Sequence, residues 1–255
     1  MSWRQLFSRW HRQPPAIPEA LWAEVLALYP FIAQRSAEDL AQLRALCAQF
    51  LASKEFHGAH GLQVTDEMAL AIAAQACLPV LKLGLRHYQG FVGIVVQADE
   101  VVVRRAVTDE DGVVHEYDEW LTGEAMEGGP VMLAWPDVAM AGEAAHGAYN
   151  VVIHEFAHVL DMGNGEPDGM PVLPDDTARQ HWAQTLDTEY EAFLDDLDAG
   201  LDTFLDPYGG EAPEEFFAVA AEAFFVQPRG MKAEHPALYA MLASYFEQDP
   251  AQFVA

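Results

Sequence analysis

The segment AYNVVIHEFAHVLDMGNGEPDG spans Ala148–Gly169 and places two histidines and one glutamate inside an otherwise apolar run. The apolar residues predict an amphipathic helix, and the Gly-Asn-Gly sequence at 163–165 predicts its end. His154 and His158 are four residues apart, so their imidazoles leave one helix face about 40° apart around the axis. Two neutral imidazoles at this spacing supply half of a tetrahedral zinc site.

Glu155 lies next to His154 but about 100° away around the helix, too far to join the two histidines as a ligand. A carboxylate at this position can take a proton from a water molecule that zinc activates. The alternative is a coincidental pattern in a buried helix. That alternative is costly, because polar side chains in an apolar environment need partners. The segment therefore predicts one zinc ion per chain.

A third protein ligand has to come from another part of the chain. Six residues beyond His158 the sequence has Asn164 instead of a third histidine, which excludes the metzincin pattern. The later segment PEEFFAVAAEAFF predicts a helix that carries Glu214, Glu215 and Glu222. Glu215 and Glu222 share a helix face, so one can bind the metal while the other orients an imidazole. Glu214 and Glu215 also fit the ordinary place of acidic residues in a first helical turn.

The rest of the chain changes from helical to strand-like periodicity and back. Helical patterns occupy 18–32, 36–56 and 66–83, with Ser36 and Thr65 as capping residues. Runs rich in β-branched residues follow at 91–97, 101–107 and 113–120, and another short strand is expected within 128–138. Helical patterns return at 181–197, 214–228 and 236–249. This order predicts a mostly helical α+β fold with a small, mainly antiparallel sheet beside the helix of His154.

Composition narrows the classes of partner. The chain has 255 residues with 40 acidic and 13 basic side chains, a net charge of −27, which argues against direct binding of nucleic acid. No run of 18 apolar residues is present, so no membrane span is expected. The basic, Pro-rich start at 1–18 has no apolar core of a secretory signal, which favours the cytoplasm. We expect one domain over 19–255, with a helical part at 19–90 and the sheet and metal-site helices at 91–255.

Several long blocks of the sequence, in this order, resemble one known family. They are FLASKEFHGAHGLQVTDEMALAIAAQACLPVLKLGL, DGVVHEYDEWLTGEAMEGGPVMLAWPDV, VVIHEFAHVLDMGNG and DPYGGEAPEEFFAVAAEAFF. The chain is similar to the Mlc titration factor A family of zinc-dependent peptidases, whose catalytic part is similar to the anthrax lethal factor protease domain within the gluzincin-like group. The resemblance covers most of the chain and implies a zincin-like peptidase domain.

The resemblance also assigns roles to residues at matching positions. It implies that His154 and His158 are zinc ligands, that Glu155 is the general base, and that Glu215, directly before Phe-Phe-Ala, is the third ligand. Tyr208 matches a family position whose hydroxyl faces the metal and can stabilise an oxyanion. The segment GGPVMLAWPDV would be a strand along which a peptide can add.

Two further residues match positions of the family, and the sequence departs from the family pattern at two places. Asp161 and Glu222 match positions that support the metal ligands. The residues before PEEFF are Gly-Glu-Ala where relatives often carry a Thr-Asn type cap, so Glu214 remains a rival to Glu215. Val219 stands where thermolysin-like enzymes have an acidic residue, so that supporting role must come from elsewhere.

Two functions of different classes follow from these observations. The first is hydrolysis of peptide bonds in peptides or short proteins, and the family is associated with aminopeptidase-like activity. The second, implied by the family name, is a binding protein that sequesters a glucose-type transcriptional repressor and has little or no peptidase activity. An acidic protein can dock on the basic face of such a repressor. We expect a monomer in either case.

Overall fold

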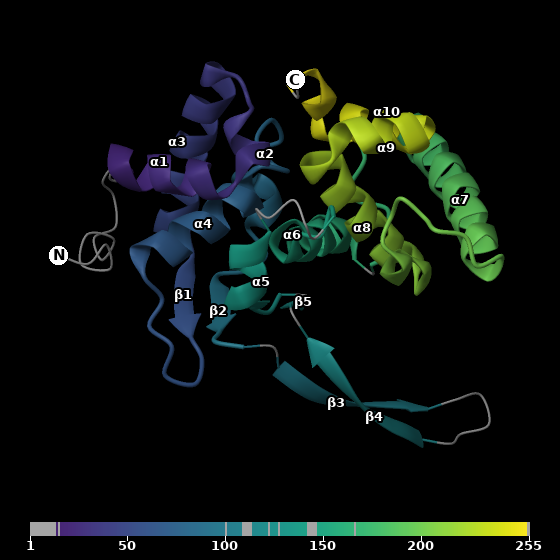
Figure 1. Cartoon of the computed structure of the whole chain (residues 1–255), viewed down its shortest axis with the longest axis horizontal. Coiled ribbons are helices and arrows are strands. Elements are labelled where there is room, and N and C mark those ends of the chain that lie inside the picture. Colours follow the sequence, from purple (N-terminus) through teal and green to yellow (C-terminus); the bar gives the residue numbers. More distant parts are fainter. Residues whose placement is uncertain are drawn as a thin grey trace.

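The computed structural model describes residues 14, 16–99, 101–108, 114–121, 123–126, 128–141, 147–165 and 167–253, with backbone only for 101–108 and 114–121. Most of the expected tail at 1–18 lies outside the described residues. The fold class is confirmed, because helices dominate and a small sheet lies beside them (Figure 1). Within the described part of the chain, no helix is long and apolar enough to cross a membrane.

The N-terminal helices form one side of the molecule (Figure 1). They are α1 (Glu19–Leu28), α2 (Pro30–Ala33), α3 (Ala37–Ser53) and α4 (Asp66–Cys77). Both predicted caps are present. The Ser36 hydroxyl accepts a hydrogen bond from the N–H of Asp39, and the Thr65 hydroxyl accepts one from Met68, which satisfies N–H groups that a helix start leaves without partners.

The four-stranded sheet differs from the prediction in the direction of its strands. Its order is β1 (Glu55–Gly58), β2 (Gly93–Gln97), β6 (Val131–Ala134) and β5 (Gly123–Ala125). The pairs β1–β2 and β2–β6 are parallel, and only β5–β6 is antiparallel. The prediction of a mainly antiparallel sheet is therefore wrong here. β1 lies at the end of what reads as one helical run, and the segment containing α4 provides the long crossover that parallel strands need.

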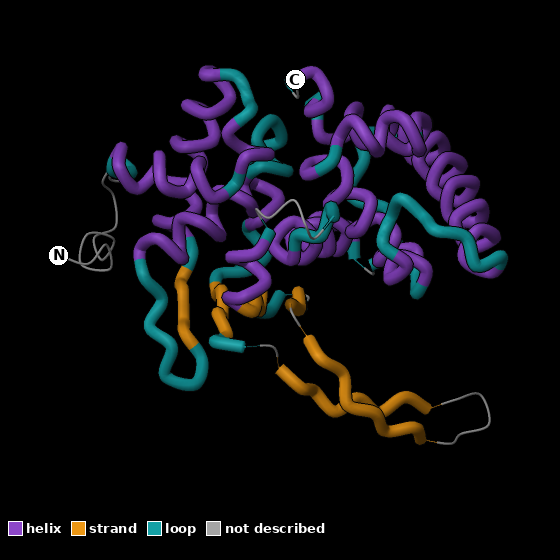
Figure 2. The backbone as a smooth tube through the Cα atoms, in the orientation of Figure 1, coloured by secondary structure: helices purple, strands orange, loops and turns teal. Residues whose placement is uncertain are grey.

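The antiparallel pairing that the sequence does predict lies in a separate hairpin. β3 (Val101–Thr108) pairs with β4 (Val114–Leu121) along its whole length. Figure 2 shows this hairpin extending away from the body of the molecule, beyond β5. The strand expected within 128–138 ends one residue before Trp135, where α5 (Trp135–Met140) begins with Pro136 in its first turn. Proline is compatible with this place because the first N–H groups of a helix have no partner inside the helix.

The helix with the two histidines, α6 (Val151–Asp161), is central to the fold and contacts α4, α8 and β5. Aromatic side chains pack against the apolar face of α6. The ring centroid of Phe156 lies 4.9 Å from that of Tyr88, 5.8 Å from that of Phe50 and 5.9 Å from that of Phe91. The remaining elements are η2 (Leu85–Tyr88), η4 (Met162–Asn164), α7 (Asp176–Asp198), η5 (Pro207–Gly210), α8 (Pro213–Val226), α9 (Pro228–Glu234), α10 (Pro236–Phe246) and η6 (Pro250–Gln252).

Candidate metal centre

Two imidazoles and one carboxylate converge between α6 and α8. The Nε2 atoms of His154 and His158 are 3.2 Å apart, and Oε2 of Glu215 lies 3.0 Å from the first and 3.4 Å from the second. α6 supplies both histidines from one face, as the spacing predicts, and the first turn of α8 supplies the glutamate. Together the three residues form a group that could hold a metal ion.

Buried hydrogen bonds on its Nδ1 side, away from Glu215, hold the ring of His154 in place. Its Nδ1 atom lies 2.8 Å from Oε1 of Glu222, and the other oxygen of Glu222 accepts from the backbone N–H of Asn150. Asn150 also caps α6, since its side-chain oxygen accepts from Ile153, and its amide donates to Oε1 of Gln75 on α4. α4, α6 and α8 are thus joined at the base of the site.

This arrangement determines which atom of His154 faces Glu215. If Nδ1 donates its proton to Glu222, Nε2 of the neutral ring has a lone pair. That lone pair points at the carboxylate of Glu215 and at the second imidazole, so only a proton or a metal cation between them makes the cluster favourable. Burial lowers the pKa of His154, but hydrogen bonds to Glu215 and Glu222 outweigh it and raise the pKa well above its usual value.

The lowered pKa of Glu215 is consistent with a positive charge between this carboxylate and the two imidazoles. Burial alone would raise the pKa of its carboxyl group, but hydrogen bonds with both imidazoles lower that pKa to about 2. Glu215 is therefore an anion over the whole physiological pH range. Glu214, the rival candidate, is the neighbouring residue on α8, but Glu215 is the one whose carboxylate reaches the histidines.

The spacing of the three atoms fits a small divalent cation. Zinc binds nitrogen and oxygen ligands at about 2.0–2.2 Å in tetrahedral geometry, which separates ligand atoms by about 3.3–3.5 Å. The three measured separations of 3.0, 3.2 and 3.4 Å are within a few tenths of an ångström of this range. Imidazole and carboxylate are also the ligand types that zinc accepts.

Glu155 is buried on the side of α6 that faces β5. A Cβ atom placed on Gly123 of β5 would lie only 2.4 Å from Oε1 of Glu155, so this glycine leaves the space that the carboxylate occupies. Burial raises the pKa of Glu155 to about 7, although the nearby His154 and His158 oppose the rise. A carboxylate with such a pKa can both accept and return a proton near neutral pH.

Tyr208 and Asp161 are the two remaining residues that the sequence assigns to this region. Tyr208 on η5 is 44 % exposed, and its ring centroid is 6.0 Å from that of His154. Asp161 is buried at the end of α6, where Oδ2 accepts the N–H of Gly169 at 2.8 Å. Gly169 in turn packs against the carbonyl of Pro213, at the start of the helix that carries Glu215. Asp161 therefore contacts the backbone that positions α8.

Three residues of this region are absent from the sequence-based prediction. Asn150 could have been found, because an Asn directly before a long apolar helix is a cap signal. Gln75 and Gly123 gave no local signal, since their partners are 75 and 32 residues away in the sequence, at Asn150 and Glu155. Tertiary packing alone brings them to the site.

The chain was compared with known proteins. It matches the family model described as glucose-regulated metallo-peptidase M90 over residues 2–247. It is 37 % identical to an uncharacterized protein of Synechocystis, covering 98 % of this chain and 90 % of that protein. It is 34 % identical to Mlc titration factor A of Edwardsiella ictaluri (95 % and 93 % covered) and 32 % identical to that of Salmonella arizonae (91 % and 92 %). The His-His-Glu cluster could hold the metal ion that such a peptidase needs. Because the family model matches residues 2–247, the chain belongs to the glucose-regulated metallopeptidase family M90.

Proposed function

We propose that this protein is a zinc-dependent peptidase that acts as an aminopeptidase on peptides or short proteins. The main observation in support is that His154, His158 and Glu215 converge at separations suited to zinc, with Glu155 buried beside them. In this proposal the first three residues are the zinc ligands, one ion is bound per chain, and Glu155 is the general base. The family supports the metallopeptidase class, and the donor set supports zinc.

Zinc, when bound, polarises the scissile carbonyl and makes water acidic enough to react near neutral pH. Glu155 takes a proton from the attacking water and later gives it to the leaving amine. The hydroxyl of Tyr208 stabilises the negative charge that develops on the carbonyl oxygen. Glu222 holds the Nδ1 proton of His154 and so keeps Nε2 directed into the cluster.

The direct test uses purified protein, metal analysis and an amino-acid anilide. We expect about one zinc ion per chain and release of the aniline, with loss of activity on chelation and recovery on addition of zinc. Zinc-loaded protein that hydrolyses neither anilides nor a mixture of short peptides would contradict the proposal.

Substitution of Gly123 by alanine is expected to lower kcat without loss of zinc. The new methyl group would lie 2.4 Å from Oε1 of Glu155, so the carboxylate has to move. Misplacement of a reacting group by about 1 Å costs roughly 100-fold in rate. Gly93→Ala is the matched control, because its Cβ would lie in the same sheet, 3.3 Å from Pro130 Cβ and away from Glu155. Equal kcat values for the two variants would show that the position of Glu155 is not critical.

The Glu222→Gln variant is expected to bind zinc about 10–100-fold more weakly, because it loses the negative charge that holds His154. The new amide has only one acceptor oxygen, whereas Nδ1 of His154 and the N–H of Asn150 each contact an oxygen of Glu222. The amide NH₂ group would therefore face one of these two donors. Competition with a chromogenic chelator measures the affinity. Glu189→Gln is the control, since Glu189 contacts Nδ1 of His235 at 3.1 Å in another part of the molecule. An unchanged affinity for zinc would show that Glu222 does not support His154 as a ligand.

The names of the relatives support a second function. Proteins called Mlc titration factor A are 34 % and 32 % identical to this chain. In this second proposal the protein binds a transcriptional repressor, and it does so as a monomer in the cytoplasm. The two functions separate in one experiment. A Glu155→Gln variant that cannot hydrolyse peptides keeps its surface, so repressor binding survives in that variant if binding is an independent function.

A further inference from the structure

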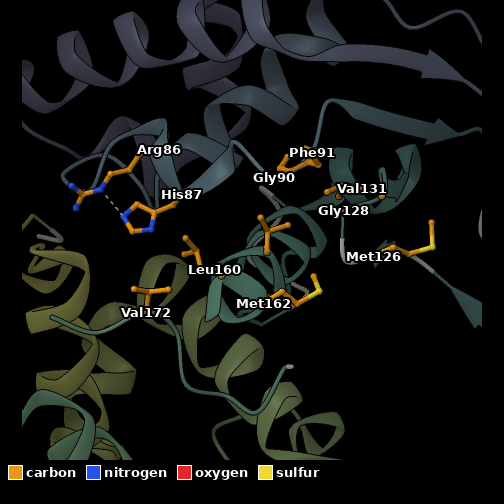
Figure 3. A pocket seen from close by; sticks show the side chains of 13 residues that line it. Arg86, His87, Gly90, Phe91, Met126, Gly128, Val131, Leu160, Met162 and Val172 are labelled. Carbon is orange, nitrogen blue, oxygen red and sulfur yellow. Dashed lines mark hydrogen bonds between the residues drawn. The ribbon is translucent and has the colours of Figure 1, made fainter. Parts of the chain in front are cut away.

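A pocket of about 510 Å³ lies against α6. The described part of its wall comes from the end of α6 and the start of η4, from η2 and the residues that follow it up to Phe91, and from Val172. Between β5 and β6, Met126, Gly128 and Gly129 contribute, as does Val131 of β6. Figure 3 shows Met126 at one end and Arg86 with His87 at the other, with Leu160 of α6 and Met162 of η4 between them. This volume is typical of pockets that bind small molecules or side chains.

The pocket adjoins the proposed catalytic residues. Val159 of α6 and Met162 at the start of η4 line it. They follow Glu155 by four and seven residues, so they lie on the same side of the helix as Glu155 and toward its C-terminal end. On the facing side, Met126 directly follows β5, the strand whose Gly123 contacts Glu155. A peptide that presents its scissile bond to Glu155 therefore lies next to the mouth of this pocket.

Apart from Arg86 and His87 at one end, the described side chains of the lining are apolar. Phe91, Val131 and Leu160 are buried at its base. At the rim, Met126 is 42 % exposed and Val172 is 46 % exposed. Apolar side chains that gather at the mouth of a hollow mark a binding site for an apolar group. The thioethers of Met126 and Met162 can adapt to side chains of different shape.

The charge of the lining differs from that of the whole protein. The chain contains 40 acidic residues among 255, yet none of the described residues that line the pocket is acidic. Among the described lining residues, Arg86 carries a fixed positive charge, and burial, together with the nearby Arg86, lowers the pKa of His87. A lysine or arginine side chain would lose its hydration here and meet the positive charge of Arg86, whereas an apolar side chain is stabilised when it leaves water.

We propose that this pocket binds the apolar side chain of a leucine, methionine or phenylalanine that flanks the scissile bond, and so makes such peptides the preferred substrates. The proposal rests on the peptidase function proposed above. Removing large apolar side chains from water favours their binding, and discrimination between apolar side chains of different size is about 10–200-fold in kcat/KM.

The test begins with the zinc-loaded full-length protein and a mixture of peptides of known sequence. Mass spectrometry of the products identifies the residues on both sides of each cleaved bond. We expect leucine, methionine and phenylalanine to be enriched at one of these two positions, and lysine and arginine to be depleted there. Peptides that differ only at that position then give kcat/KM for leucine relative to alanine, which we expect to be about tenfold or more.

Two variants link the preference to the pocket. Met126→Glu places a charge at the rim and should reduce the ratio of leucine to alanine at least threefold. Met140→Glu is the matched control, because Met140 on α5 is 37 % exposed and does not line the pocket. Cleavage without any side-chain preference, or an equal ratio in both variants, overturns the pocket proposal but leaves the peptidase function standing. Absence of all cleavage overturns both.

A binding measurement supplies evidence that does not depend on turnover. In the Glu155→Gln variant with ¹³C-labelled methionine methyl groups, a leucine peptide should shift the resonances of Met126 and Met162 and leave that of Met140 unchanged. The alanine peptide should shift them less at the same concentration. Equal shifts for both peptides, or a shift at Met140 alone, contradict the assignment of the pocket.

Discussion

The Glu155→Gln variant is expected to lose peptide hydrolysis while it keeps its zinc. Glutamine has nearly the same shape, so the helix and the buried contact with β5 remain. It cannot take a proton from water, and removal of a general base lowers kcat by about 10²–10⁴-fold. Measurements of kcat on a leucine anilide and of zinc content on the same sample separate chemistry from metal binding.

The environment of Glu155 explains why the effect should be large. The side chain is buried, burial raises its pKa to about 7, and Gly123 leaves it just enough space. If Glu155 is the general base, as we propose, solvent cannot easily take the place of a side chain held in this way. Glu189→Gln is a suitable control, because Glu189 also contacts a histidine but lies away from the site. A Glu155→Gln variant that hydrolyses the anilide at the wild-type rate would remove Glu155 from the mechanism.

Loss of the Glu215 carboxylate is expected to release the metal. In the Glu215→Ala variant only the two imidazoles remain, and His154 also loses the anion 3.0 Å from its Nε2. Since direct ligands matter at least as much as the groups behind them, we expect zinc affinity to fall by more than the 10–100-fold given for supporting residues. Chelator competition gives the affinity, and activity should disappear at limiting zinc.

Glu214→Ala is the matched control for this prediction. Glu214 is the adjacent glutamate in the same first turn of α8, so both substitutions remove one negative charge near a helix start. If zinc affinity falls in Glu215→Ala and stays unchanged in Glu214→Ala, the loss comes from coordination and not from charge. Equal losses in both variants, or a larger loss in Glu214→Ala, would contradict the ligand set.

The sequence predicts part of this site well because that part is local. The spacing of His154 and His158 fixes their positions on one helical face whatever the rest of the fold does. The choice between Glu214 and Glu215 is different. Adjacent residues point about 100° apart, so the orientation of α8 against α6 decides which carboxylate arrives, and no local pattern specifies that orientation. The structure places Glu215 at the histidines.

The sheet illustrates the same limit. β1 reads as the end of a helical run because Phe56 continues the apolar pattern of α3, and a strand of four residues has too few positions to show its own period. Strand direction depends on connections, which local periodicity does not report. The contact between Gly123 and Glu155 likewise joins an edge strand to a helix, so it emerges only from the packed structure.

Diffraction at the zinc absorption edge, from crystals of the zinc-loaded protein, tests the central assignment most directly. We predict one anomalous peak at about 2.0–2.2 Å from Nε2 of His154, Nε2 of His158 and a carboxylate oxygen of Glu215, with solvent as the remaining ligand. A peak elsewhere in the chain, or a fourth protein side chain in place of solvent, would contradict a catalytic metal centre at this site.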